Sequence, residues 1–396
     1  MKILSKVFDY RIKAYNILTE ISVSEYLEIA KIILENNPFQ RKRLKSSSSI
    51  YSLLKQDLKL GCTIPPLVLA LSNENIEIND NDDDNQSLDY INTHRDKLII
   101  LDGLQRTYTL LDVANDLDTE NISNKINFYD HKLRFEIYLG INKIGILYRM
   151  LTLNTGQSPM SVRHQIEILY SNYLDETVLE GIKLLKEVDE ATPHQIGEYR
   201  FNDVIDGFTS YIVRDESSLD RRDILESIKS LEKLALENQD KDIFKNYIIT
   251  YNHFVEKTQN LADNWSFNEE LLQNEEIIFS GKPFGSTVDK IFNKSQVMTG
   301  FGAAVGFLRD KELIYSFDDI NQQIDRIRIT NNAPHFLDKL IIKLDEISKS
   351  ARKIGNSQRM YFYYFFRELF SSASDTFLSI DESIDSGYKK YKLNEI

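Results

Sequence analysis

Four residues near position 100 are of types that together can hold an anion: Asp102, Gly103, Gln105 and Arg106. They follow the apolar run 98–101 and open a segment, 104–111, whose apolar residues have helical spacing. The pattern predicts a buried strand, a tight turn and a helix start, where unpaired backbone N–H groups and an arginine can bind phosphate. The same pattern also occurs without a ligand, with Asp102 as a helix cap, and spacing alone leaves both interpretations open.

The segment reads Asp102-Gly103-Leu104-Gln105-Arg106-Thr107-Tyr108-Thr109-Leu110 and resembles the DGQQR signature of a family found in GmrSD-type modification-dependent restriction enzymes and phosphorothioate-linked defence proteins. Leu104 stands where that family usually has glutamine. The wider Gly-x-x-Arg pattern is similar to that of ParB-type nucleotide-binding and sulfiredoxin-like domains, and of DGQHR proteins that include DndB regulators. Five positions agree with the signature: Asp102, Gly103, Gln105, Arg106 and Thr109.

Two further segments resemble parts of the same family. Gln40-Arg41 looks like its N-terminal Gln-Arg pair, although a basic cluster after a proline is also typical of a solvated loop. Residues 153–161 resemble an (I/L)NxxGxxLS segment that follows the DGQQR motif, and they contain Asn154 and Thr155. An ordinary helix-loop-helix turn has the same composition.

The resemblance implies a bound nucleoside triphosphate, with or without Mg²⁺. Asp102, Gln105 and Arg106 would form the catalytic group, in which Asp102 and Gln105 orient a metal-bound or attacking water. No side chains are expected to bind a metal directly. The implied nucleotide-binding and phosphate-binding residues are Gln40, Arg41, Gly103, Arg106, Thr109, Asn154 and Thr155.

The setting that the resemblance implies is prokaryotic defence, with the protein acting on or sensing foreign DNA alongside a separate nuclease or defence subunit. Hydrolysis of the nucleotide is left open. The alternative is a non-enzymatic, DndB-like protein that binds DNA or regulates a partner. A third option is a scaffold whose α/β domain no longer binds a ligand. Leu104 favours this option, because it replaces the glutamine that the family usually has there.

The surrounding patterns predict the elements that position these residues. Two helices are expected at 23–36 and 48–60, the second closed by Gly61. Two strands are expected at 63–71, led in by two prolines, and at 132–139, followed by a helix at 144–153. The polar, acidic residues 73–92 are expected to be a flexible insertion.

Beyond residue 161 the periodicity is mainly helical. The fold class predicted is α+β, with a ParB/sulfiredoxin-like α/β domain over residues 1–170 and a mainly α-helical domain over 171–396. The expected helices cover 162–173, 176–188, 202–213, 221–237, 241–259, 268–276, 320–327, 336–350 and 359–371.

Composition limits the classes of function. The net charge of −13 disfavours a protein that coats nucleic acid non-specifically, although a local basic cleft is compatible with it. The single cysteine, Cys62, excludes an internal disulfide framework, and no apolar run reaches a membrane span, so a cytoplasmic location without membrane partners is expected. No pair among the six histidines has zinc-binding spacing, and residues 332–335 do not reproduce an HNH motif, so no nuclease activity is expected.

Two other conspicuous segments are predicted to serve packing. Residues 300–306 are rich in glycine but lack the Lys-Ser/Thr end of a P-loop, which favours close helix packing. Residues 358–367 carry six aromatic side chains between arginines, and such runs in a helical setting are typical of a core.

Overall fold

The structure is a computed structural model that describes most of the chain. The described residues are 1–36, 48–72, 83–120, 125–153, 166–167, 170–174, 179, 181–185, 192–217, 242–268, 270, 279, 281–330 and 335–395. They form two compact units, one within residues 1–160 and the other within residues 161–396. Among the helices described, none combines the length and the apolar character needed to span a bilayer.

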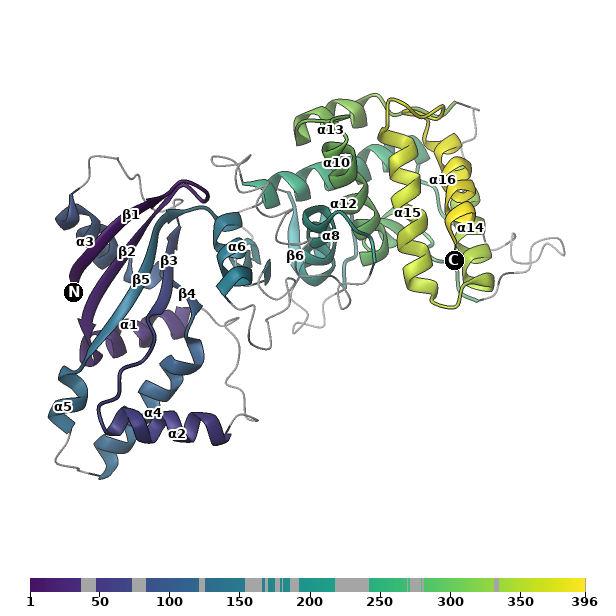
Figure 1. The fold of residues 1–396 in the computed structure, drawn as a ribbon. Helices are drawn as coiled ribbons and strands as arrows, with labels where there is room; N and C mark the ends of the chain where they lie inside the picture. The colour runs from purple at the N-terminus through teal and green to yellow at the C-terminus, as the bar shows by residue number, and fades with distance from the viewer. Residues whose placement is uncertain are drawn as a thin grey trace. The chain divides into compact units, whose positions relative to one another are not determined.

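The N-terminal unit is built on a five-stranded mixed sheet (Figure 1). Its strand order is β1 (Lys2–Asp9), β2 (Ala14–Ser22), β5 (Lys132–Ile141), β3 (Leu67–Ser72) and β4 (Ile99–Asp102). Neighbouring strands are antiparallel except β3 and β5, which are parallel. The predicted strands at 63–71, 98–101 and 132–139 are confirmed with small shifts, and the hairpin of β1 and β2 adds two strands that the sequence had not indicated.

Helices complete this unit, and the predicted helices at 23–36, 48–60 and 144–153 are confirmed. Gly61 follows α2 with a φ of +83°, as expected of a residue that ends a helix. Side chains of α1 and α4 pack with alternate residues of the central strands to form the core. The helices are α1 (Val23–Asn36), α2 (Ser48–Lys59), α3 (Asp84–Thr93), α4 (Leu104–Glu120), α5 (Lys125–Asp130) and α6 (Lys143–Leu153).

The prediction that 73–92 is a flexible insertion is wrong for its second part, since Asp84–Thr93 is the helix α3. Asp83 accepts a hydrogen bond from the Gln86 backbone N–H, and the Gln86 side chain accepts one from the Asp83 N–H, forming a capping box. The acidic residues here include the N-cap of a helix, which their composition alone does not indicate. Residues 73–82 lie outside the described residues.

The C-terminal unit is mainly helical. Its elements are a 3-10 helix (Ser171–Leu174), β6 (Lys183–Leu185), β7 (Glu198–Arg200), α8 (Phe201–Val213), α10 (Ile243–Ala262), α11 (Val288–Phe292), α12 (Ser295–Asp310), α13 (Phe317–Asp325), α14 (Phe336–Ser350), α15 (Ile354–Phe370) and α16 (Ile380–Asn394). The helices predicted at 202–213, 241–259, 320–327, 336–350 and 359–371 are confirmed. The helix predicted at 162–173 is described only in part, where its end is the 3-10 helix Ser171–Leu174, and those predicted at 221–237 and 268–276 lie wholly or largely outside the described residues.

The helix predicted at 176–188 is wrong where the structure describes it. Lys183–Leu185 is the strand β6, which pairs in parallel with β7. Leu184 and Leu185 are buried. A short apolar run cannot distinguish a strand from a helix, and the pairing with a distant segment decides it here.

Glycines and aromatic side chains form the core of the C-terminal unit, as predicted. A Cβ on Gly302 would lie 2.0 Å from the Gly207 carbonyl oxygen of α8, and a Cβ on Gly300 would lie 2.4 Å from Phe362 Cβ of α15. Phe362, Phe365 and Phe366 of α15 are fully or almost fully buried, whereas Tyr363 and Tyr364 are half-buried. The close approach of α12 to two helices therefore requires its glycines.

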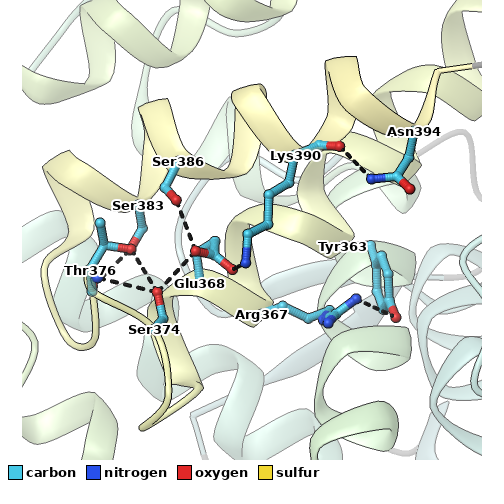
Figure 2. A network of polar contacts seen from close by, with 9 residues as sticks. All are labelled: Tyr363, Arg367, Glu368, Ser374, Thr376, Ser383, Ser386, Lys390 and Asn394. Atoms are coloured by element: carbon cyan, nitrogen blue, oxygen red, sulfur yellow. Dashed lines mark hydrogen bonds and ion pairs between the residues drawn. The ribbon is translucent and has the colours of Figure 1, made fainter.

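A buried carboxylate joins α15 to α16 (Figure 2). Glu368 accepts hydrogen bonds from Lys390 Nζ at 2.5 Å, Ser386 Oγ at 2.8 Å and Ser374 Oγ at 2.9 Å. Burial raises the pKa of the Glu368 carboxyl, but these three hydrogen bonds outweigh burial and lower the pKa overall.

Candidate functional site

The corner between β4 and α4 contains four of the predicted site residues. β4 ends at Asp102, Gly103 follows with a φ of +99°, and α4 begins at Leu104. The Gly103 carbonyl accepts the first helical hydrogen bond, from the Thr107 N–H at 2.9 Å. Gly103 is therefore the residue that precedes the helix, and Asp102 is not its cap.

The start of α4 is fixed by a chain of hydrogen bonds into the core. Thr107 Oγ1 lies 3.1 Å from the Gly103 carbonyl and donates to it, so the Tyr26 hydroxyl, at 2.6 Å, donates to Thr107. Burial raises the pKa of Tyr26, which keeps its hydroxyl protonated as a donor. This chain of bonds holds the first turn of the helix against α1.

Arg106 connects the corner to the segment that leads into β3. Its Nη1 donates to the carbonyls of Pro65 at 2.6 Å and Pro66 at 3.1 Å, and its Nη2 forms an ion pair with Asp102 Oδ2 at 2.7 Å. The side chains of Arg106 and Asp102 retain 16% and 23% of their exposure. A guanidinium has five N–H donors, so two of the five in Arg106 make no hydrogen bond with a described residue.

Gln105 is the clearest unsatisfied group at the corner. Its Nε2 is buried and has no hydrogen-bond partner among the described residues. A buried amide donor without a partner costs free energy, so native proteins usually pair it with protein, water or ligand. The first three N–H groups of α4 likewise donate no hydrogen bond within the described part of the chain. They belong to Leu104, Gln105 and Arg106.

Apolar contacts cover part of the corner. A Cβ on Gly103 would lie 2.1 Å from Leu67 Cδ2, so the Leu67 side chain sits directly over the glycine. Leu104 packs against the hydrophobic core of the unit. Gly103 is therefore buried under Leu67 and is not open to the phosphate contact that the motif resemblance implies for it.

The remaining predicted residues divide into one that is described and four that are not. Thr109 is buried on α4, one turn after Gln105, and its hydroxyl donates to the Gln105 carbonyl at 2.9 Å. Its hydroxyl proton is thus already used within the helix. Gln40, Arg41, Asn154 and Thr155 lie outside the described residues, so their proximity to Arg106 stays a prediction.

The sheet places a further carboxylate, that of Glu136, in the same row as Asp102. Val68 of β3 pairs with both Asp102 and Glu136, which places the two acidic residues in one row across β4, β3 and β5. Paired residues of neighbouring strands project on the same face, and two interstrand spacings separate them by roughly 10 Å. The alternation at 132–139 had indicated only that Glu136 is on the more polar face of its strand.

An arginine paired with a carboxylate lies further along the sheet. Arg149 of α6 forms an ion pair with Asp9, and its guanidinium lies 4.9 Å from the centre of the Tyr138 ring. Tyr138 pairs with Asn16, whose amide donates to Glu136 at 3.4 Å. Burial raises the pKa of Tyr138 and the charge of Arg149 partly opposes this, so the hydroxyl stays protonated at neutral pH.

Comparisons of this chain with protein-family models, with curated proteins and with solved structures found no match. Within the described residues, no group of three or more His, Cys, Asp or Glu side chains could hold a metal ion.

Proposed function

We propose that the N-terminal unit is a DGQQR-type, ParB/sulfiredoxin-like domain that binds a nucleoside triphosphate at the corner between β4 and α4. The observation that carries the proposal is the Gln105 amide, which has no hydrogen-bond partner among the described residues and belongs to the helix start whose N–H groups likewise make no hydrogen bond there. A bound phosphate could accept hydrogen bonds from these groups. The two remaining donors of Arg106 would add a charge-assisted hydrogen bond.

In the proposed site Asp102 and Arg106 have distinct roles. The ion pair at 2.7 Å fixes the guanidinium, while Pro65 and Pro66 hold its other end. One oxygen of Asp102 is used in this pair, and the second remains available to orient a water or a Mg²⁺-bound water. Leu67 and Leu104 exclude water from the inner side of the corner.

The biological role proposed on the resemblance is prokaryotic defence, in which nucleotide binding accompanies action on foreign DNA or sensing of it. A second candidate is a DndB-like regulator that binds without hydrolysis. The Asp102–Arg106 ion pair favours this alternative, because one oxygen of the carboxylate already contacts the guanidinium. Product formation from a nucleoside triphosphate with Mg²⁺ would distinguish hydrolysis from binding alone.

The sharpest test replaces Gln105 by leucine, which is similar in size but has no polar atoms. Removing a buried, unpartnered amide should leave the stability of the free protein unchanged or raise it. If the amide binds phosphate, the Kd for the preferred nucleotide should rise about tenfold or more, since one hydrogen bond to a charged group accounts for that factor. Titration calorimetry with each of the four nucleoside triphosphates and Mg²⁺ measures it.

Gln323→Leu provides the matched control, since Gln323 of α13 also has a buried side-chain atom without a partner, its Oε1. This variant should bind nucleotide as the parent does. Equal affinities of the parent and Gln105→Leu, or no binding by the parent, would refute the proposed site. Unlike Arg106→Ala, Gln105→Leu removes no hydrogen bond that holds the corner together.

A further inference from the structure

A polar cavity of about 340 Å³ lies within the C-terminal unit. It lies between the start of α8 and the short connection from α11 to α12. This volume is within the range of small-molecule sites, roughly 300–1,000 Å³. The lining residues that bear on its chemistry are Arg200, Asp203, Asn293, Lys294, Ser295 and Gln296.

The charges around the cavity leave an excess of cation. Arg200 and Lys294 line it from two different elements, β7 and the residue before α12. Asp203 also lines it, but Asp203 and Asp206 of α8 act on Arg359 of α15, whose charged form they favour against the effect of burial. Arg359 offsets one of these two carboxylates, so the three cations Arg200, Lys294 and Arg359 exceed the two carboxylates by one positive charge.

Hydrogen-bond donors also converge on the cavity. Arg359 Nη2 donates to Ser295 Oγ at 3.1 Å, so the hydroxyl proton of Ser295 is left to donate elsewhere. The side-chain amides of Asn293 and Gln296 make no hydrogen bond with a described residue. The backbone N–H groups of Ser295 and Gln296 open α12, whose hydrogen bonds to Lys294 begin only with Val297 and Met298.

Lys294 is held close to this site. Its Nζ donates to the Phe284 carbonyl and lies 4.0 Å from the centre of the Phe284 ring. Burial lowers the pKa of Lys294, which means that its charge is only partly solvated. An anion nearby would therefore gain more from this ammonium than from a lysine in water.

We propose that this cavity is a second ligand site, which binds a phosphate group of a small molecule. A phosphate has several oxygens directed to different sides, and donors here approach from the start of α12, from Asn293 and from Arg200. A planar carboxylate has only two oxygens that could accept hydrogen bonds from these donors, so it matches the site less well than a phosphate does. The proposal is independent of nucleotide binding at the β4–α4 corner, and it makes the helical unit a ligand-binding unit.

Gln296→Glu tests the proposal without the risk of unfolding. The substitution preserves side-chain size and places a negative charge in the first turn of α12, where an acidic residue normally stabilises a helix. The same charge would repel a bound phosphate. The expected result is an unchanged or raised unfolding midpoint, together with a Kd for pyrophosphate that rises about tenfold or more in titration calorimetry of the full chain.

Two further variants complete the experiment. Gln322→Glu adds the same charge at an exposed position of α13 and should bind pyrophosphate as the parent does. Gln105→Leu tests the other candidate site. The proposal is overturned if the parent does not bind pyrophosphate at millimolar concentration, if Gln296→Glu binds it as well as the parent, or if only Gln105→Leu weakens binding.

Discussion

Single residues at the β4–α4 corner carry two kinds of constraint. Gly103 must adopt a left-handed φ of +99° and must leave room for Leu67. Arg106 must reach two proline carbonyls and Asp102 at once. A planar, forked guanidinium can do this and a lysine ammonium cannot do it with the same geometry. The corner thus holds α4, β4 and the segment before β3 together, in addition to being a candidate binding site.

Gly103→Ala should destabilise the N-terminal unit by about 2 kcal/mol or more. The positive φ is strained for a residue with a Cβ, and this strain alone costs about 1–3 kcal/mol. The new Cβ would also lie 2.1 Å from Leu67 Cδ2, so the leucine must move. Urea unfolding followed by circular dichroism measures the loss.

Leu67→Ala provides the partner variant for this prediction. It removes the atom that clashes with the new Cβ but leaves the backbone strain. The double variant should therefore lose less stability than the sum of the two single variants. Strict additivity of the two losses would contradict the contact between Leu67 and position 103.

At the scale of elements, glycine decides how closely α12 packs on α8. Gly302→Ala would gain about 1 kcal/mol in an isolated helix, because alanine has the higher helix propensity. Here its Cβ would lie 2.0 Å from the Gly207 carbonyl oxygen, and backbone cannot move away as a flexible side chain can. The expected result is a net loss of about 2 kcal/mol or more, visible as a lower unfolding midpoint in calorimetry.

Gly355→Ala in α15 is the matched control for that prediction. Its Cβ would meet only the end of the Arg359 side chain, at 3.3 Å, within the described residues. Helix propensity should then dominate, and the midpoint should stay the same or rise. A similar loss at both positions would show that backbone packing is not what requires Gly302.

The link between α15 and α16 predicts a pH dependence of stability. The pKa of Glu368 is lower in the folded protein than its usual value, so the carboxylate contributes stability at pH values above that usual value. This contribution is lost as the pH falls through the lowered pKa. Glu368→Gln should therefore lose less stability than the parent between about pH 7 and about pH 3.

Measurement of the unfolding free energy at both pH values, by denaturant titration, checks this prediction. Glu28→Gln alters an exposed residue of α1 and should keep the acid sensitivity of the parent. If Glu368→Gln and the parent lose equal stability on acidification, the network in Figure 2 does not carry the effect.

For the whole molecule, charge limits how the protein can contact nucleic acid. The net charge of −13 repels the phosphate backbone, and non-specific binding depends on neutralising many phosphates. Duplex DNA of mixed sequence should therefore not bind detectably at roughly 0.15 M salt. Fluorescence anisotropy with a labelled duplex measures it, and tight binding that weakens steeply with salt would contradict the prediction.

The sequence by itself determined most elements whose pattern is local. The apolar run at 98–101, the Asp-Gly pair and the spacing of α4 gave the strand, turn and helix correctly. The glycines of 300–306 and the aromatic residues of 358–367 were correctly assigned to packing. Hydrophobic periodicity and the conformational freedom of glycine act over a few residues, so both can be recognised without knowing the fold.

Only the tertiary structure decided which distant groups meet at the corner. Nothing in the sequence indicates that Arg106 binds the carbonyls of Pro65 and Pro66, that Leu67 covers Gly103, or that Glu136 shares a row with Asp102. The strand β6 likewise depends on β7. These contacts are set by strand register and by the packing of segments far apart in the chain, which local preferences do not determine.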